Sequence, residues 1–155
     1  MYTAEGWRQH YAQFYEKVRP LVLPMLSANE VTALEGFWQE LLDSKEFFQF
    51  SQALIHRDLD GAHVLVDGSA VAGVIDFADA CIADPAFDFS GWEGDFRERA
   101  LAAYERSPAK REQLSARAET YRRIGPFHAV IYGVECSQPE WLTRGIEAVR
   151  AGLKA

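Results

Sequence analysis

The chain has 155 residues, 48% of them apolar and 25% charged, a composition typical of a globular protein. Its formal net charge of −7 argues against a nucleic-acid partner, because neutralising phosphates requires a basic surface. No apolar stretch approaches the ~18 residues needed to span a bilayer, and the first residues do not resemble a signal peptide. We therefore expect a single cytoplasmic domain over residues 1–155 that contacts no membrane.

Residues 4 to about 48 carry a helical pattern. The first apolar stripe repeats every three or four residues on one helix face, and its members are Trp7, Tyr11, Phe14, Val18 and Leu21. Pro20 and Pro24 are expected to kink or end this helix, because proline lacks an amide hydrogen. Ser27 and Glu30 form a capping box that opens a second helix. Its buried stripe is Val31, Leu34, Phe37 or Trp38, and Leu41.

Residues 53–90 change to short apolar runs broken by turn residues. The runs 53–55, 63–66 and 72–75 predict strands, and Asp67-Gly68-Ser69 predicts a hairpin between the second and the third. The loops that connect them carry most of the acidic and imidazole groups of this segment. Functional residues are frequent on loops held by rigid elements, so this insert is where we look for chemistry.

The pattern is helical again from about residue 93. Three apolar groups predict successive helices: Phe96, Leu101 and Tyr104, then Leu114, Ala118 and Tyr121, then Phe127, Val130, Ile131 and Val134. Pro139 begins a last helix, with an inner face of Trp141, Leu142, Ile146 and Val149. The expected fold class is mainly α (α+β), a helical bundle with a small strand-and-loop insert.

The insert contains two motifs in a fixed order. His56-Arg57-Asp58-Leu59, with His63 further along, is similar to the kinase signature H-R-D-L-x-x-x-N, and Asp76-Phe77 to the D-F of D-F-G. Phosphoryl transfer requires a positioned acceptor and neutralised phosphate oxygens. In this pattern Asp58 takes the proton of the acceptor hydroxyl. Asp76 holds Mg²⁺, and His63 completes the metal shell.

The surrounding residues strengthen this comparison. Residues 73–80, the Asp84-Pro85-Ala86-Phe87-Asp88 run and the helix at 127–133 resemble the aminoglycoside phosphotransferase family over nearly all of residues 5–150. The resemblance implies a protein-kinase-like C-terminal lobe with ATP or GTP as the donor. The acceptor would be a hydroxyl of a small cationic molecule such as an aminoglycoside, as in antibiotic resistance. It also implies that Asp58 is the catalytic base and that His63 and Asp76 bind Mg²⁺.

Seven other polar residues receive roles from this resemblance. His56, Arg57, Asp84 and Asp88 are expected to support the site structurally. Three acidic residues could bind the acceptor or simply form a solvated face, namely Asp60, Asp79 and Glu135.

Three positions depart from the family pattern. Arg57 replaces a usual glycine, and Ala78 replaces the glycine of the second motif. His63 stands where the metal-binding asparagine is usual. Imidazole is a poorer ligand for Mg²⁺ than an amide oxygen and suits Mn²⁺ or Zn²⁺ better.

A further departure concerns the phosphate-binding loop and the strand lysine of a complete kinase fold. Residues 1–52 contain only Gly6 and Gly36, and Lys17 and Lys45 lie in helical patterns. We therefore expect an absent N-terminal lobe, an exposed apolar surface, and either self-association or a separate N-lobe-like partner. Three hypotheses stay open: a catalytic half-site completed by another polypeptide, a non-catalytic ligand- or partner-binding module, and a structural protein with a relic motif.

Overall fold

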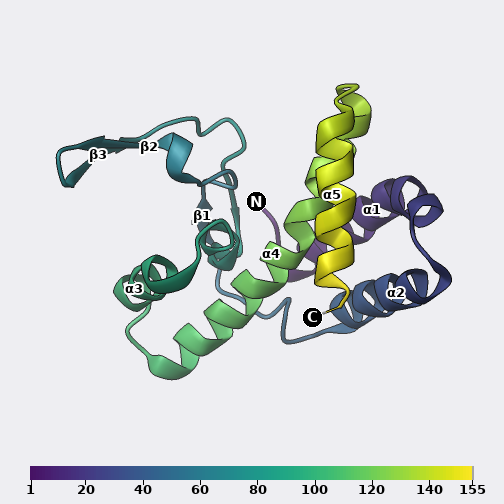
Figure 1. The fold of residues 1–155 in the computed structure, drawn as a ribbon. Helices are drawn as coiled ribbons and strands as arrows, with labels where there is room; N and C mark the ends of the chain where they lie inside the picture. The colour runs from purple at the N-terminus through teal and green to yellow at the C-terminus, as the bar shows by residue number, and fades with distance from the viewer. Residues whose placement is uncertain (155) are drawn as a thin grey trace. The chain divides into compact units, whose positions relative to one another are not determined.

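The computed structural model describes residues 1–154, which are mainly helical with two small two-stranded sheets (Figure 1). This confirms the predicted helical chain with a strand-and-loop insert. Contacts group the chain into two compact units. Residues 1–3 and 50–122 form the first unit, and residues 4–49 with the chain from Arg123 onward form the second. Within the described residues, no helix has the length and apolar character to cross a membrane.

Helix α1 (Ala4–Val22) belongs to the second unit and buries one aromatic and aliphatic stripe, Trp7, Tyr11, Val18 and Val22. Pro20 does not end the helix, because it lies inside the last turn. The α-helix ends two residues before Pro24, which lacks the amide hydrogen needed to continue it. A short 3-10 helix, η1 (Leu23–Met25), follows. Val22 replaces the predicted Leu21 as the last buried residue of the stripe.

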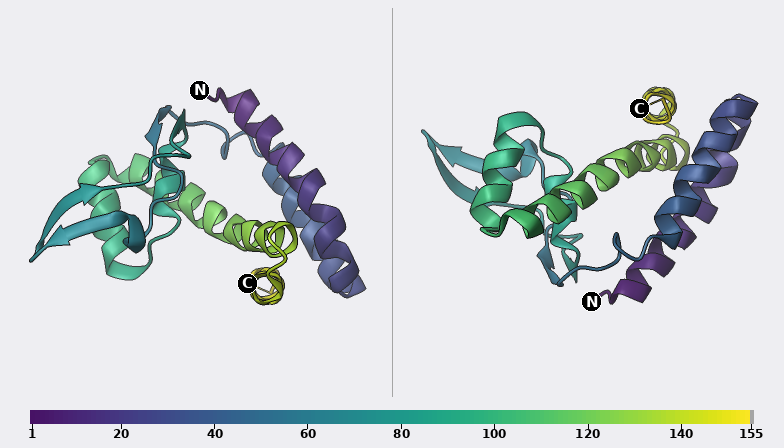
Figure 2. Two further views of the ribbon diagram at one scale, coloured as in Figure 1. Left: turned by 90° about the horizontal axis from the view of Figure 1, so that it is seen from above. Right: turned by 90° about the horizontal axis from the view of Figure 1, so that it is seen from below.

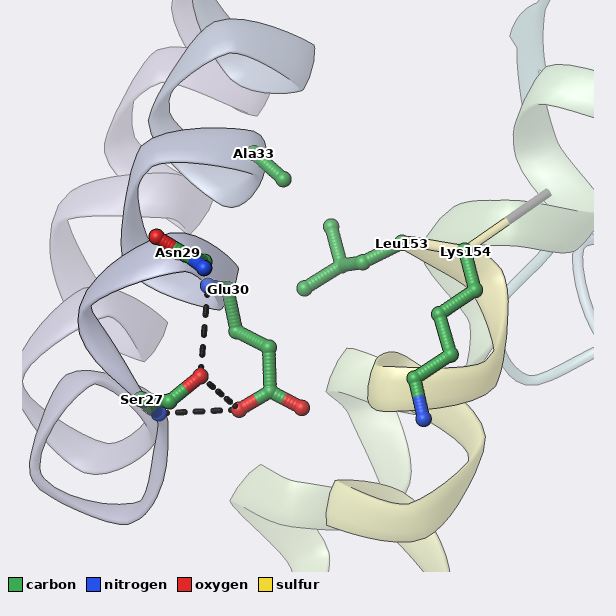
Figure 3. A pocket seen from close by; sticks show the side chains of 6 residues that line it. All are labelled: Ser27, Asn29, Glu30, Ala33, Leu153 and Lys154. Carbon is green, nitrogen blue, oxygen red and sulfur yellow. Dashed lines mark hydrogen bonds between the residues drawn. The ribbon is translucent and has the colours of Figure 1, made fainter.

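Helix α2 (Ala28–Asp43) begins at the predicted capping box. The Ser27 amide donates to Glu30 Oε2 at 2.8 Å, and the Glu30 amide donates to Ser27 Oγ at 3.4 Å (Figure 3). Trp38 is the fully buried member of the Phe37–Trp38 pair. Figure 3 also shows a shallow pocket in this unit, which contains no residue of the two motifs; its lining is Ser27, Asn29, Glu30, Ala33, Leu153 and Lys154.

Helix α4 (Pro108–Glu135) is one continuous helix, whereas the sequence predicted two. The helix passes through Pro126 because the preceding residue is Gly125, which has no Cβ to clash with the proline ring. Buried Ile124 and Phe127 on either side hold the two halves in place. Residues up to Arg122 group with the first unit and later residues with the second.

Helix α5 (Pro139–Gly152) packs closely against the end of α4. A Cβ on Gly133 would lie 2.4 Å from the Leu142 backbone nitrogen, and one on Gly145 would lie 2.8 Å from Val130 Cγ2. The predicted inner positions Val134 and Trp141 are wrong, since these side chains are 42% and 47% exposed. The close approach at the glycines turns the buried face of α5 toward Gly145, Ile146 and Val149.

The first unit contains four short strands. Strand β1 (Ala53–Ile55) pairs antiparallel with β4 (Cys81–Ala83), and β2 (Val64–Asp67) pairs antiparallel with β3 (Ala70–Val74). The hairpin predicted at Gly68 is confirmed, with a φ of 60° that glycine adopts without strain. The β2–β3 hairpin extends as a narrow arm (Figure 2), and helix α3 (Gly94–Tyr104) belongs to the same unit. Strand β4 was not predicted, and it exists through its pairing with β1.

Candidate active site

The two motifs meet because of the register of the β2–β3 hairpin. The loop after β1 leads through the 3-10 helix η2 (Gly61–His63) into β2, and Asp76 follows the end of β3. Val64 is paired with Val74, so the residues beyond each strand end also lie opposite each other. The Ile75 amide donates to the His63 carbonyl at 3.0 Å. This backbone bond places Asp76 beside the loop that carries Asp58.

Asp88 fixes the start of this loop. It lies in the 3-10 helix η3 (Pro85–Phe89), and its two carboxylate oxygens accept the amides of His56 at 2.7 Å and Arg57 at 2.8 Å. Arg57 has a φ of 73°, a left-handed conformation that costs a non-glycine residue on the order of 1 kcal/mol. The two hydrogen bonds that Asp88 accepts stabilise this turn immediately before Asp58.

The His56 ring connects the two motif loops through hydrogen bonds at both of its nitrogens. Its Nδ1 accepts the Asp58 amide at 3.3 Å, which requires the proton to be on Nε2, and Nε2 donates to the Ile75 carbonyl at 2.8 Å. The side chain is 4% exposed, and its ring lies between those of Phe77 and His63, with centroids 4.6 Å and 5.8 Å away. The neutral ring therefore ties the Asp58 backbone to the loop that leads to Asp76.

His63 is held by the backbone carbonyl of Asp58. Its Nδ1 lies 2.6 Å from the Asp58 carbonyl oxygen, so Nδ1 donates and Nε2 is directed elsewhere. Nε2 lies 4.0 Å from Asp76 Oδ2. The bond to the Asp58 carbonyl raises the pKa of His63, with further contributions from the charges of Asp58, Asp60 and Asp76, while partial desolvation opposes the shift.

The side chains of Asp58 and Asp76 are 60% and 58% exposed, so both carboxylates are open to a ligand. Asp60 Oδ1 accepts the Ala62 amide at 2.7 Å and lies 3.6 Å from His63 Nδ1. Asp79 is exposed. The structure thus brings Asp58, Asp60, His63 and Asp76 together in one unit.

Glu135 is placed differently. It belongs to the second unit and forms an ion pair with Lys17 Nζ at 2.6 Å, so a cationic ligand would compete with this lysine.

Asp84 is a buried acidic residue of the first unit. The side chain is 0% exposed and accepts hydrogen bonds from Arg117 Nε at 2.8 Å, Tyr121 Oη at 3.0 Å and the Ala86 amide at 3.0 Å. The arginine and the tyrosine were missed as site-supporting residues. In the sequence, Tyr121 is part of an apolar stripe. Arg117 lies one helical turn before Tyr121, and this spacing is the signal that could have predicted its contact with Asp84.

A divalent cation requires oxygen or nitrogen ligands within a short distance of one another. Among residues 1–154, no group of three or more His, Cys, Asp or Glu side chains is arranged to hold a metal ion alone. Two ligands of one Mg²⁺ lie no more than about 4.2 Å apart, because each bond is about 2.1 Å long. The 4.0 Å between His63 Nε2 and Asp76 Oδ2 satisfies this limit. The pair fits a cation whose other ligands are phosphate oxygens and water, as is usual for Mg²⁺ bound with a nucleotide.

Comparison with known structures confirms the predicted fold class, the kinase-like C-terminal lobe. The GDP and kanamycin complex of APH(2")-IIia superimposes with a TM-score of 0.82 at 22% identity, covering 94% of this chain and 51% of that one. The macrolide 2'-phosphotransferase MphH from Brachybacterium faecium gives a TM-score of 0.70 at 20% identity, with 96% and 51% covered. At such identities the likeness establishes the shared fold.

Sequence comparison establishes the family. The model of the phosphotransferase enzyme family matches residues 2–127, so the chain belongs to this family. It is 28% identical over 128 residues to the uncharacterized protein YcbJ of Bacillus subtilis (strain 168). That alignment covers 76% of this chain and 40% of YcbJ, so the chain spans less than half of the relative and about half of the solved structures.

Proposed function

We propose that this protein takes part in transfer of the γ-phosphoryl group of ATP or GTP to a hydroxyl of a small cationic acceptor such as an aminoglycoside. The observation that carries the proposal is the pairing of two exposed carboxylates, Asp58 and Asp76, on loops joined through His63. Membership of the phosphotransferase family supports the reaction class. The solved GDP and kanamycin complex of a protein with the same fold supports the kinds of donor and acceptor.

In this proposal Asp58 is the general base. Its carboxylate orients the acceptor hydroxyl and accepts its proton as the oxygen attacks the phosphorus. Positioning supplies much of the rate in phosphoryl transfer. The Asp58 backbone is fixed by His56 at its amide and by His63 at its carbonyl, so the base is held in place before the acceptor binds.

His63 and Asp76 would hold Mg²⁺ or Mn²⁺, which when bound neutralises charge on the phosphate oxygens of the nucleotide. Asp60 and Asp79 would attract ammonium groups of the acceptor. Both side chains are exposed on the motif loops, where an acidic surface concentrates a cationic substrate.

Calorimetric titration tests the nucleotide part of this proposal. We expect Mg²⁺-ATP or Mg²⁺-GTP to bind the wild-type chain, and the Asp76→Asn variant to bind more weakly because it loses a charged ligand. Glu112→Gln, on the exposed side of α4, is the matched control and should bind like the wild type. Absence of nucleotide binding in every combination would overturn the enzyme reading for this chain.

A non-catalytic module that binds a ligand or a partner is the second candidate. The observation that favours it is that residues 4–22 and 28–43 form helices α1 and α2, without the glycine-bearing loop and strand lysine that cradle the nucleotide phosphates in complete kinases. Binding of kanamycin in the same titration without any nucleotide binding would select this reading.

A partner surface is proposed from the exposed apolar side chains of the first unit. Leu54 is 70%, Val66 is 68% and Val71 is 66% exposed, and all three lie on the short strands near the motifs. Val66 and Val71 are paired on the β2–β3 hairpin, whereas Leu54 lies on β1, and exposed apolar side chains commonly mark an interaction site. A self-associating chain or an N-lobe-like polypeptide would cover them, and light scattering at increasing concentration distinguishes self-association from a monomer.

A further inference from the structure

We propose that His63 makes the cation site of the first unit selective for Mn²⁺ over Mg²⁺. The inference rests on the proposed function, since it concerns the cation that would accompany the nucleotide. It goes further by assigning the selectivity to one nitrogen atom, Nε2 of His63, and it makes a spectroscopic prediction that does not depend on turnover.

The protonation of the His63 ring follows from its hydrogen bond to the backbone. Nδ1 is 2.6 Å from the carbonyl oxygen of Asp58, and a carbonyl can only accept. Nδ1 therefore carries a proton, and in the neutral ring, which is the form that binds a metal, Nε2 presents its lone pair. Metal-binding histidines commonly donate their other nitrogen to a backbone carbonyl or a carboxylate in this way, which fixes the ring and raises its basicity.

The second step is the direction of that lone pair. Asp58 Oδ2 and Asp60 Oδ1 lie 3.8 Å and 3.6 Å from Nδ1, so these carboxylates flank the donor side of the ring. Asp76 Oδ2 is the carboxylate oxygen near Nε2, at 4.0 Å, which is too long for a hydrogen bond. The ring and Asp76 therefore offer one nitrogen and one oxygen to an ion between them.

The third step is the rigidity of the arrangement. The His63 side chain is 20% exposed, and its ring stacks on that of His56 with an interplanar angle of 22°. His56 is itself fixed through hydrogen bonds at both ring nitrogens. Turning Nε2 away would break both the stack and the bond to the Asp58 carbonyl, so the nitrogen stays in the site.

The chemistry of the ions then decides the selectivity. Mg²⁺ prefers oxygen ligands in regular octahedral geometry and gains little from imidazole. Mn²⁺ accepts the same carboxylate and phosphate oxygens and also binds imidazole nitrogen, and the later ions of the series bind it more strongly still. An asparagine at position 63 would present an oxygen and remove this difference.

The test is pulsed electron paramagnetic resonance of Mn²⁺ bound with ADP to the full chain, combined with displacement of Mn²⁺ by Mg²⁺. We expect modulation from a directly bound ¹⁴N nucleus and a preference for Mn²⁺ beyond that of ADP alone by on the order of tenfold. His63→Asn should abolish the nitrogen signal and the added preference. His128→Asn, which removes an exposed imidazole of the second unit, should keep both.

The remaining outcomes distinguish a failure of the Mn²⁺ selectivity from a failure of nucleotide binding. If Mn²⁺-ADP binds to the wild-type chain without a nitrogen signal, and with the same ion preference in His63→Asn, the selectivity is overturned while nucleotide binding stands. If the wild-type chain binds neither Mn²⁺-ADP nor Mg²⁺-ADP, the proposed function fails and the inference fails with it. If His63→Asn does not fold, ¹⁵N labelling of the histidines in the wild-type chain decides the question, because the label changes the signal only when the bound nitrogen belongs to a histidine.

Discussion

The backbone amide of Arg57 donates to Oδ1 of Asp88 at 2.8 Å, which fixes a left-handed residue one position before the proposed catalytic base. Asp88 is 31 residues away in sequence, so this bond connects η3 to the motif loop. The second oxygen of the same carboxylate holds the preceding amide of His56.

The first prediction concerns Asp88 as a positioning residue. In Asp88→Asn one of the two amides faces an NH₂ group in place of an oxygen, so the turn before Asp58 loosens. We expect kcat for phosphoryl transfer to fall by roughly 10- to 100-fold with little change in KM, because misplacement of a base affects the reacting geometry. Hydrogen exchange at His56 and Arg57 should accelerate, a change that Asp43→Asn at the end of α2 should not produce. Unchanged exchange would contradict the proposed clamp.

The second prediction concerns the buried charge of Asp84. Asp84→Ala leaves the Arg117 guanidinium, 12% exposed, without its carboxylate and should lower the free energy of unfolding by about 3–5 kcal/mol. Tyr121→Phe removes one hydrogen bond and should cost about 1–2 kcal/mol. Chemical denaturation measures both. If Asp84→Ala lowers the free energy of unfolding by less than Tyr121→Phe does, Arg117 is solvated without its partner.

The third prediction concerns the packing of α4 on α5. Gly133→Ala places a methyl group 2.4 Å from the Leu142 backbone nitrogen and should destabilise the chain by about 1–3 kcal/mol. Gly36→Ala is the matched control within α2, where nothing lies within 4 Å of the added atom. It should stabilise by about 0.5–1 kcal/mol, since alanine favours the helix. Equal thermal shifts in the same direction would refute the close helix contact.

The fourth prediction concerns stability at acid pH. Hydrogen bonds from Arg122 and then Arg97 lower the pKa of Glu119 to about 2, against burial, which raises it. A lowered folded-state pKa stabilises the fold above the unfolded value of about 4.3, and this contribution disappears as pH falls from there toward 2. Glu119 is 40% exposed, so solvent screening limits the effect to on the order of 1 kcal/mol.

Glu119→Gln should therefore lose less stability than the wild type between pH 4.5 and pH 2, the window set by the lowered pKa. Glu112→Gln on the same helix changes an exposed carboxylate and should titrate like the wild type. Parallel denaturation curves for Glu119→Gln and wild type across this window would show that the two arginines do not stabilise the carboxylate.

Whether the sequence predicted a structural feature depends on how far apart in the sequence the residues that determine it lie. Local signals were sufficient for the Ser27–Glu30 cap, the Gly68 turn and the beginning of α5 at Pro139. Signals that depend on partners distant in sequence failed. Strand β4 exists through its pairing with β1, and Ile124 and Phe127, which flank Gly125 and Pro126 in α4, are buried.

The same division applies to the candidate site. The order and spacing of the motifs predicted the candidate residues, and the hairpin register explains why Asp58, His63 and Asp76 come together. The sequence could not predict the tautomers of His56 and His63, because these follow from contacts with the Ile75 and Asp58 carbonyls. It also missed the Arg117 partner of Asp84, 33 residues away.

The central claim is that Asp58 acts as the base in phosphoryl transfer by this chain. Mass spectrometry of kanamycin incubated with the chain, Mg²⁺ or Mn²⁺, and ATP or GTP tests it most directly. We predict a phosphorylated product with the wild type and with Glu112→Gln, and its loss with Asp58→Ala. Product formed equally by Asp58→Ala, or no product from the wild type under any combination of donor and cation, would contradict the account.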